Sequence, residues 1–504
     1  MAVTAPSTSR LAAGTLSLVP ADRRPLVPPG YVRPGIVHLG VGAFHRAHQA
    51  VYTEEAIAGG GGDWGTVGVA PRTRTVIDHL AAQDCLFSVT SLDGHGSGTR
   101  VIGGLTGVRF APADPGAVVA LLADPAIRVV TLTVTEKAYL LDPASGRLLP
   151  DDALLADLTT DRPPSTVPGL LVRGMLARAR ADGGPVALVS CDNLPANGRR
   201  LAGLVHRALD LAAAHGTASE AATAWVHDNV RFPGTTIDRI VPASTPQTLS
   251  QAADALGVLD LAAVAAEPYR QWVIEDDFPG GRPAWEKAGA ILTEDATPWE
   301  QLKLRALNGV HSTLAYLGAV AGCETIADAL ALPNMSAVLR RFLADDIAPS
   351  LTPPPGVSVI HYGDSVLERF ANPVICHRTL QVAMDGTQKL PQRVLHGMQA
   401  RRAAGAVPQW SALVLAAWMR FAMGHGDDGR PLPLDDPLAD AVHAAIAGTD
   451  GSPGAVVSAL LGLDAVFPPD LADDPVVRSL VVDWLSSLTR NGVRATILAA
   501  DGGS

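Results

Sequence analysis

The sequence predicts an α/β protein in which a doubly wound, mostly parallel sheet is followed by a mostly α-helical domain. Over about residues 35–245, short apolar strands alternate with helix-like segments, the pattern of a parallel sheet covered on both faces. A Gly/Pro cluster at 278–283 then marks a boundary. Beyond this cluster the apolar residues recur at helical spacing.

These patterns divide the chain into three parts. Residues 1–34 are rich in Pro, Ser, Thr and Ala and lack the basic start and apolar core of a signal peptide, so we expect a loose N-terminal extension. Residues 35–285 would form the sheet domain, and residues 286–504 would form the helical domain.

Composition and charge exclude several classes of partner. Lys and Arg number 39 against 50 for Asp and Glu, and the resulting net charge of −11 argues against a nucleic-acid partner or an anionic membrane surface. The longest apolar runs, such as 412–418, are too short to span a membrane. The four cysteines are far apart and form no CxxC pair, so we expect no disulfide framework, no metal site and a reducing, cytoplasmic location.

The first strand and the turn after it suggest nucleotide binding. Residues 35–40 are an apolar run, and a helix should begin soon after Gly42. Gly40 and Gly42 would allow a tight turn and bring backbone N–H groups close to a pyrophosphate. His45 stands where GxGxxG has its third glycine, so a plain strand–turn–helix is the alternative.

The second strand leaves the choice of nucleotide open. We expect a strand over 64–70 and a helix over 75–83. A dinucleotide fold carries an acid at the end of this strand for the ribose hydroxyls, but here Arg72 and Arg74 follow it. NAD and NADP are both compatible with these residues, and solvated loop arginines are the simpler interpretation.

Further strands are expected later in the sheet domain. Residues 87–92 and 101–110 suggest an antiparallel insertion, and the β-branched run 129–135 is typical of a central strand. The apolar strand 186–190 leads into a loop that contains Asn193. Asn193 is either a turn residue or an amide directed at substrate. Helices are expected at 117–123 and 170–181.

The segment 299–314 is predicted to form a helix that carries several potential catalytic side chains on one face. At about 100° per residue, Glu300, Lys303, Asn308 and His311 share less than half of its circumference. A lysine that faces a cleft loses solvation and becomes a better base, while an Asn amide can donate to an oxygen that gains charge. The alternative is a solvated face with one Glu–Lys pair. Further helices are expected at 324–330, 335–347, 363–371, 374–384, 408–424, 436–446, 454–461 and 474–489.

Seven segments, in order and spread over about residues 35–395, carry a resemblance to a known family. They are GIVHLGVGAFHRAHQAVY, TLTVTEKAY, SCDNLPANG, TIDRIVPA, EPYRQWVIEDDFPGGRPAWEKAGA, KLRALNGVHS and ERFANPVICHRTLQVAMDGTQKLPQR. Together they resemble the polyol-specific long-chain dehydrogenases, the mannitol dehydrogenase family. Lys303, Asn308 and His311 match the family signature Lys-x4-Asn-x2-His.

The resemblance implies an N-terminal Rossmann-type domain that binds NAD, with NADP not excluded, and a C-terminal helical domain with the active site between them. It implies metal-independent oxidation of a secondary alcohol at C2 of an open-chain polyol or sugar acid. It also implies a monomer or small homo-oligomer. The cofactor-binding residues would be Gly40, Gly42, Phe44, His45 and Arg46.

The same resemblance assigns roles at the reacting centre. Lys303 would be the general acid/base, and Glu300 would pass its proton to and from solvent. Asn193 and Asn308 would hold the reacting oxygen, and His311 would orient the substrate. Asp238 and Lys389 would contact the substrate hydroxyls or its far end.

The substrate is less well specified than the chemistry. The segment 376–393 looks closer to fructuronate reductases, also called D-mannonate oxidoreductases, than to mannitol 2-dehydrogenases, which usually carry Arg where Gln381 stands and Gly where Lys137 stands. We therefore favour D-fructuronate/D-mannonate, with D-mannitol/D-fructose as the alternative. A uronate carboxylate requires a cation, and each candidate could equally be a structural charge; the candidates are Lys137, Arg378, Lys389 and Arg393.

Two other classes of protein are compatible with the fold. A catalytically silent sugar or nucleotide sensor would be expected to lose Lys303 or an asparagine of the oxygen-binding pair, and these residues are present. A lyase or epimerase would use the nicotinamide transiently. Stoichiometric formation of NADH from an alcohol would distinguish a dehydrogenase from both.

Overall fold

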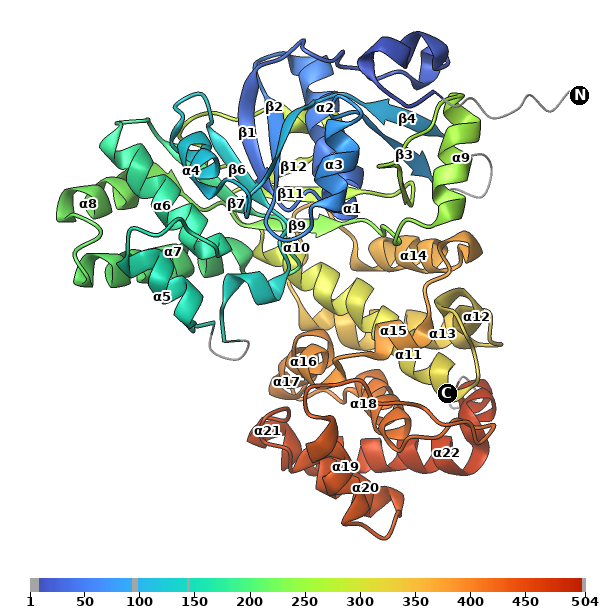
Figure 1. Ribbon diagram of the computed structural model, residues 1–504. Helices are drawn as coiled ribbons and strands as arrows, with labels where there is room; N and C mark the ends of the chain where they lie inside the picture. Colours follow the sequence, from blue (N-terminus) through green and yellow to red (C-terminus); the bar gives the residue numbers. More distant parts are fainter. Residues whose placement is uncertain (1–8, 93–97, 143–145, 501–504) are drawn as a thin grey trace, which may run out of the picture. The chain divides into compact units, whose positions relative to one another are not determined.

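The computed structural model describes residues 9–92, 98–142 and 146–500, and the chain divides into two compact units, Met1–Ala296 and Thr297–Ser504 (Figure 1). The first unit contains the sheets and the second unit is helical. The predicted α/β class, with a sheet domain followed by a helical domain, is therefore confirmed. The domain boundary expected at 285/286 stays a prediction.

The first unit is built on a six-stranded parallel sheet in the order β5-β2-β1-β6-β7-β8. Numbered along the chain, this is the order 3-2-1-4-5-6 of the doubly wound dinucleotide-binding fold. The order reverses at β1, which lies between β2 and β6. The strands are β1 (Pro34–Leu39), β2 (Gly65–Ala70), β5 (Leu105–Phe110), β6 (Val129–Leu132), β7 (Val186–Ser190) and β8 (Val230–Arg231).

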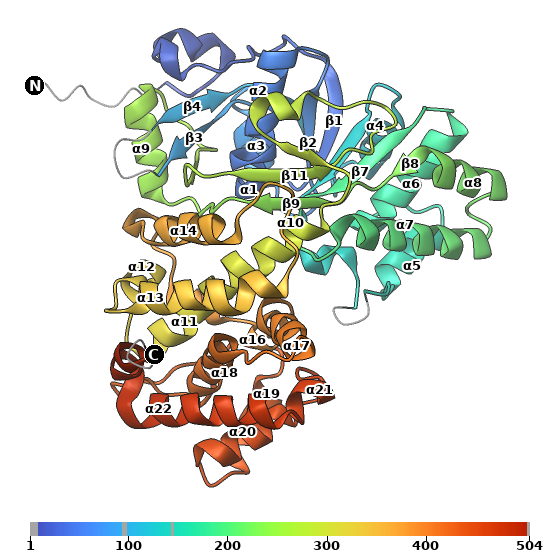
Figure 2. The same cartoon turned by 180° about the vertical axis from the view of Figure 1, so that it is seen from behind.

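Apolar residues on both faces of this sheet explain why helices cover both. Val37 and Val130 belong to a core shared with α4 (Pro115–Ala123), α6 (Val167–Arg180) and α7 (Asn197–Ala214), seen beside the sheet in Figure 2. Their sequence neighbours Ile36 and Val129 point to the other face, against α2 (Gln49–Gly60), Trp272 and Trp285. The helices α5 (Asp152–Thr159) and α8 (Glu220–Asn229) lie next to α6.

Two three-stranded sheets flank the main sheet. The predicted antiparallel insertion is the pair β3 (Phe87–Ser91) and β4 (Thr99–Ile102), which β10 (Val264–Ala266) extends. The single strand expected over 101–110 is wrong, because β4 ends before Gly103 and β5 begins after Gly104. The N–H of Gly103 donates to the Glu54 carboxylate at 3.0 Å, so it is unavailable to a strand ladder. The other small sheet contains β9 (Thr235–Asp238), β11 (Gln271–Glu275) and β12 (Ile291–Thr293).

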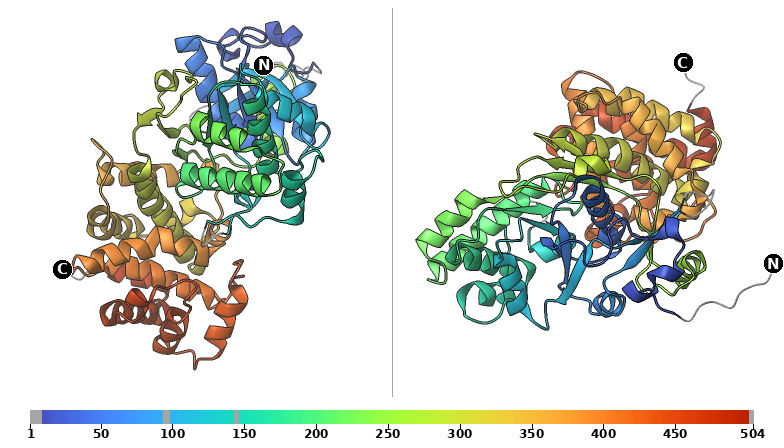
Figure 3. Two further views of the ribbon diagram at one scale, coloured as in Figure 1. Left: turned by 90° about the vertical axis from the view of Figure 1, so that its left-hand side faces the viewer. Right: turned by 90° about the horizontal axis from the view of Figure 1, so that it is seen from above.

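The second unit is organised around two buried helices, α11 (Gly309–Val320) and α18 (Gln409–Ala422), which pack on each other (Figure 3). Every residue of α11 is buried. The other α-helices of this unit are α10 (Thr297–Leu302), α12 (Ile326–Leu330), α13 (Met335–Arg341), α14 (Val359–Phe370), α15 (Thr379–Ala383), α16 (Gly386–Leu390), α17 (His396–Ala403), α19 (Ala439–Ala447), α20 (Pro453–Leu461), α21 (Pro469–Ala472) and α22 (Pro475–Ala499). Three π-helical turns join neighbouring helices: Lys303–Asn308, Phe342–Ile347 and Pro391–Leu395.

Two helix predictions in this unit need correction, and one helical stretch was missed. The helix expected over 374–384 is interrupted at Cys376, whose φ of +49° is left-handed and ends the short 3-10 helix before α15. The helical stretch from α16 to α17, which contains Pro391, was not predicted. The last helix runs beyond 489 to Ala499 through a kink at Gly492, where φ is +75°.

Candidate active site

The turn after β1 requires glycine at one position. Gly40 has a φ of +104°, and a Cβ atom there would lie 2.0 Å from the carbonyl oxygen of Thr133. Its N–H donates to the carbonyl of Val69 in β2 at 2.8 Å. The turn therefore passes tightly between β2 and β6, at the point where the strand order reverses. Gly42, which precedes α1 (Ala43–Ala47), has an ordinary φ of −74° and space for a Cβ atom.

His38 supports this turn by a hydrogen bond, and the sequence analysis did not predict this role. Its Nε2 lies 3.0 Å from the carbonyl oxygen of Gly40, which only accepts, so Nε2 carries the hydrogen. Its Nδ1 therefore accepts from Thr131 Oγ1 at 2.7 Å, and Thr133 Oγ1 donates to the same Gly40 carbonyl at 2.8 Å. Burial lowers the pKa of His38 to about 3, so the ring is neutral. The available signal was a histidine within an otherwise apolar strand.

The remaining residues predicted to bind the cofactor brace the same turn. His45 is buried and stacks on His38 with ring centroids 3.4 Å apart. Arg46 is buried and donates from Nη1 to the carbonyl of Val41 at 3.0 Å. Phe44 is half-buried and stacks on His48. A glycine position that a Cβ would fill, at the switch point of a 3-2-1-4-5-6 sheet, fits the pyrophosphate of a dinucleotide.

The end of β2 carries arginines where a ribose-binding acid would stand. Arg72 and Arg74 are exposed. Arg74 forms an ion pair with Asp78 at 3.2 Å on α3 (Thr75–Ala81). This exposed pair, four residues apart at the start of a helix, agrees with the interpretation of Arg74 as a solvated surface residue.

Asn193 is exposed in the loop after β7, and the residue before it anchors that loop. The Asp192 carboxylate accepts the N–H groups of Val134 and Thr135, each at 3.0 Å, and the hydroxyl of Tyr139 at 2.7 Å. Burial raises the pKa of Asp192, although these hydrogen bonds favour its charged form. The Asn193 loop is thus fixed to the chain that leaves β6.

Asp238 is buried at the end of β9, and an unpredicted pair of residues ties its strand to β7. Asn197 Nδ2 donates to both the carbonyl and Oγ1 of Thr235 at 3.0 Å, and Asn197 Oδ1 accepts the Thr235 N–H at 2.9 Å. Thr235 Oγ1 in turn donates to the carbonyl of Ser190 at 2.6 Å. The strand that carries Asp238 is therefore joined to the strand that precedes Asn193.

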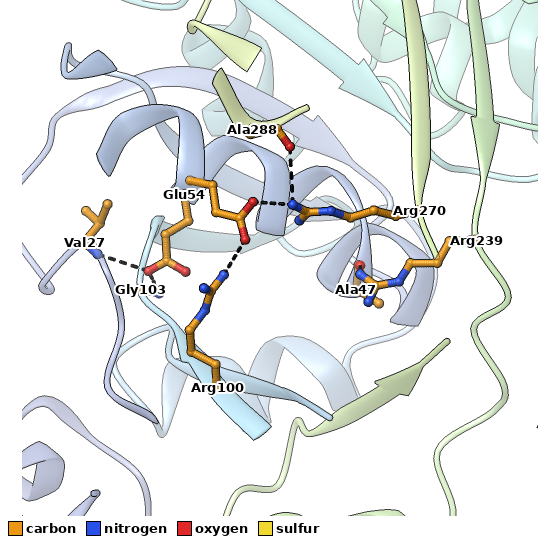
Figure 4. Close-up of polar contacts among 9 residues, drawn as sticks. Val27, Ala47, Glu54, Arg100, Gly103, Arg239, Arg270 and Ala288 are labelled. Atoms are coloured by element: carbon orange, nitrogen blue, oxygen red, sulfur yellow. Dashed lines mark hydrogen bonds and ion pairs between the residues drawn. The ribbon is translucent and has the colours of Figure 1, made fainter. Parts of the chain in front are cut away.

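An arginine–glutamate cluster links the same strand to α1, the helix that follows the turn after β1 (Figure 4). Arg239 follows Asp238 and donates to the carbonyls of Ala47, at the end of α1, and of Glu267. Nearby, Glu55 pairs with Arg100 at 2.7 Å and with Arg270. Beside it, burial raises the pKa of Glu54 to about 7. These contacts cross-link the first unit, and the sequence alone gave no spacing that predicts them.

The second unit places Lys303 on a π-helical turn. The segment Lys303–Asn308 is π-helical, and the N–H of Gly309 donates to the carbonyl of Leu304, five residues back. The regular α-helix assumed from the sequence is therefore wrong here. A turn with five-residue bonds brings Lys303 and Asn308 closer to one line than an α-helix would, and single π turns are frequent at functional sites. Glu300 and Lys303 are both half-buried.

The Asn308 and His311 side chains are buried, and each has a nitrogen atom without a hydrogen-bond partner among the described residues. Asn308 is 7% exposed and His311 is 9% exposed. Among the described residues, neither Asn308 Nδ2 nor His311 Nε2 finds a hydrogen-bond partner. The His311 ring stacks on Phe370 of α14 with centroids 4.6 Å apart. Burial lowers the pKa of His311, so the imidazole is neutral near pH 7.

Several basic groups lower the pKa of His311. After burial, the largest influences on its pKa come from His377, Arg393, Lys389 and Arg369, all of which lower it. Arg393 donates from Nη1 to Ser312 Oγ at 2.9 Å and to the carbonyl of Asn308 at 3.5 Å. Of the predicted substrate-binding residues in this unit, Lys389 is one whose charge lowers the pKa of His311. Arg378 is exposed at the start of α15.

The described residues contain neither a candidate metal site nor a membrane-spanning helix. In ranges 9–92, 98–142 and 146–500, no three His, Cys, Asp or Glu side chains gather as metal ligands. In the same ranges, no helix is long and apolar enough to cross a lipid bilayer.

The strand order and the glycine turn define a dinucleotide-binding fold, and comparisons with known proteins identify the family. The model of the mannitol dehydrogenase Rossmann domain matches residues 34–287, and that of the mannitol dehydrogenase C-terminal domain matches residues 295–488. The chain therefore belongs to the mannitol dehydrogenase family of oxidoreductases.

Three relatives place the chain within this family. The uncharacterized oxidoreductase YeiQ of Escherichia coli K12 is 40% identical, over 89% of this chain and 91% of that protein. The D-mannonate oxidoreductase of the same organism is 38% identical, over 92% and 95%. The solved ternary complex of Pseudomonas fluorescens mannitol 2-dehydrogenase with NAD and D-mannitol is 32% identical, with a TM-score of 0.84 over 98% of this chain and 100% of that one.

Proposed function

We propose that this protein is an NAD-dependent dehydrogenase that interconverts D-mannonate and D-fructuronate by oxidation and reduction at C2. The first unit would bind the nucleotide through the turn at Gly40, and the second unit would supply Lys303 as the general acid/base. The similarity to a D-mannonate oxidoreductase over nearly the whole chain supports this substrate.

The observation that carries the choice of an acidic substrate is the basic environment of His311. Arg369, Lys389 and Arg393 each lower the pKa of this ring, and Arg393 donates a hydrogen bond to Ser312, the next residue along the chain, at 2.9 Å. Positive charge at a partly buried site favours an anionic ligand, because charge-assisted hydrogen bonds to a carboxylate are stronger than those to a hydroxyl. A hexonate carries that charge, whereas a hexitol does not.

The mechanism follows from the chemistry of each side chain. In oxidation, Lys303 as the free amine removes the proton of the C2 hydroxyl, and Glu300 passes that proton to solvent. Asn308 donates from Nδ2 to the oxygen as its charge grows, and Asn193 of the first unit has the same role. Neutral His311 hydrogen-bonds a substrate hydroxyl and orients the carbon chain. Such donors commonly contribute a few kcal/mol each to the transition state.

A bound nicotinamide nucleotide supplies the hydride acceptor for oxidation and the hydride donor for reduction. In reduction, the ammonium form of Lys303 protonates the new alkoxide, so the same residue serves both directions. We propose NAD as the nucleotide, in keeping with the NAD present in the Pseudomonas fluorescens complex.

D-Mannitol oxidation to D-fructose is the second candidate function. It is favoured by the full-length likeness to a mannitol 2-dehydrogenase that was solved with D-mannitol. The same Lys303 chemistry would apply, and the basic groups near His311 would then bind hydroxyls.

The test is NADH formation by the purified protein with D-mannonate and with D-mannitol, each offered with NAD and with NADP. We expect turnover with D-mannonate and NAD and a much lower kcat/KM with D-mannitol. Turnover with D-mannitol alone would overturn the substrate assignment and leave the Lys303 mechanism standing. Failure to form reduced nucleotide with either substrate would favour the silent sensor.

A further inference from the structure

His377 lies in a tight turn that directs one side chain inward. The residue before it, Cys376, has left-handed backbone angles, which are rare for a residue with a side chain. Cys376 and Arg378 are exposed, while His377 between them is half-buried. The carbonyl of His377 accepts the N–H of Ile326 at 2.9 Å, which fixes the turn to α12. Strained backbone that the surroundings hold in place is often found at functional sites.

The His377 side chain contacts His311, the histidine of the family signature. The rings of His377 and His311 have centroids 4.8 Å apart at an interplanar angle of 60°. Within the described part of the chain, no hydrogen-bond partner reaches the buried Nδ1 of His377, which puts it in the same condition as His311 Nε2 and Asn308 Nδ2. Buried polar atoms in proteins are nearly always paired, so these three nitrogens are candidates for hydrogen bonds to a ligand.

The charge around His377 indicates which part of a ligand would lie there. Burial and the ammonium of Lys389 lower the pKa of His377, so its ring is neutral and offers one N–H. Lys389 itself lies 4.0 Å from Asp385 and donates to the carbonyl of Met384. An anionic oxygen beside His377 would gain a charge-assisted hydrogen bond and the attraction of Lys389, whereas a hydroxyl would gain a neutral hydrogen bond.

We propose that His377 is a substrate-binding residue that hydrogen-bonds the carboxylate of the sugar acid beside Lys389, and so helps to select acids over polyols. This inference rests on the proposed function, since it assigns a residue to the acid end of the same substrate. The role proposed for His377 differs from that of His311, because His311 belongs to the family signature and is proposed to orient the carbon chain of the substrate.

The test compares His377→Leu and His377→Asn with the wild-type protein. Leucine removes the hydrogen bond at similar size, while the Asn amide presents a donor at the position of Nδ1. His443→Leu, the same substitution at an exposed position of α19, is the matched control. Steady-state kinetics would use D-mannonate and D-mannitol, and thermal melting would verify that each variant is folded.

We expect His377→Leu to raise the KM for D-mannonate at least about tenfold, the usual scale for one hydrogen bond to a charged group. Its kcat/KM for D-mannitol should stay within about twofold, and His377→Asn should recover most of the loss with D-mannonate. Equal losses with both substrates, or no loss with D-mannonate, would overturn the assignment of His377.

The proposed function is judged separately, by the wild-type protein. If the wild type does not oxidise D-mannonate, the substrate proposal falls. His377 is then still tested by calorimetric binding of D-mannonate and D-mannitol to wild type and His377→Leu. A loss specific to the acid would support its role, and no differential loss would contradict it.

Discussion

The first unit and the Lys303 helix of the second unit each contain a buried asparagine and a buried histidine. The two regions differ in whether the protein hydrogen-bonds these side chains. In the first unit, Asn197 is hydrogen-bonded through both amide atoms, and His38 is hydrogen-bonded through both ring nitrogens. In the second unit, Asn308 and His311 are also buried, though slightly less deeply, and each keeps a nitrogen without a partner among the described residues. The first pair positions the chain, and the second pair is the one that we propose for substrate binding.

This difference teaches that burial and residue type do not separate structural from functional polar groups. The separating property is whether the protein itself satisfies the group. A satisfied buried amide stabilises the fold by joining elements, as Asn197 joins β7 to β9. An unsatisfied one costs free energy in the absence of ligand, and a substrate that pairs with it recovers that cost.

The largest expected effect comes from removing Lys303, the proposed base. Lys303→Ala should lower kcat by about 10³-fold, because general acid–base catalysis commonly supplies 10²- to 10⁴-fold. Nucleotide affinity, measured by fluorescence titration, should stay within about twofold, since Gly40 and its supports belong to the first unit. Near-normal turnover in this variant would rule out Lys303 as the base.

A smaller effect is expected from the turn in the first unit. Gly40→Ala should destabilise the protein by about 2 kcal/mol or more, because φ is +104° and the Cβ would meet Thr133. Gly42→Ala is the matched control and should change stability by less than about 1 kcal/mol, since its backbone suits alanine. Denaturant unfolding measures both variants. Equal effects would mean that the turn is not as tight as described.

The smallest effect concerns pH. The folded pKa of His38 is about 3, below the value of 6.5 that applies in the unfolded chain. The unfolded state therefore binds the proton first, and the free energy of unfolding falls as the pH drops from about 6.5 towards 3. Replacing His38 by Gln should reduce this slope by up to about 1.4 kcal/mol per pH unit. An unchanged slope between pH 7 and 5 would contradict the buried neutral ring.

Much of the fold was predictable because its strands are apolar runs that end in glycine or polar loops. The parallel sheet, the antiparallel insertion and the helical second unit follow from such patterns. The break at Gly103 and the π turn at Lys303 were not predictable, since both depend on hydrogen bonds between distant or offset backbone groups. The helix through Pro391 was missed because a π turn accommodates the proline.

The candidate site was predictable where its residues share a local motif. Lys303, Asn308 and His311 lie within nine consecutive residues, and the resemblance to the family identified them as candidate site residues. Asn197, Thr235 and His377 act through contacts that are distant in sequence, so spacing gave no signal for them. His38 gave a weak signal, as a polar residue in an apolar strand.

The contrast between satisfied and unsatisfied groups is tested most directly by measuring Asn308→Ala and Asn197→Ala side by side. Asn308→Ala should lower kcat by about 10²- to 10³-fold and leave the free energy of unfolding unchanged or raised. Asn197→Ala should lower the free energy of unfolding by about 1–3 kcal/mol, because Thr235 loses its partners, and should change kcat much less. If Asn308→Ala unfolds the protein more easily while Asn197→Ala abolishes turnover without loss of stability, the assignment of the two asparagines is reversed and the account is wrong.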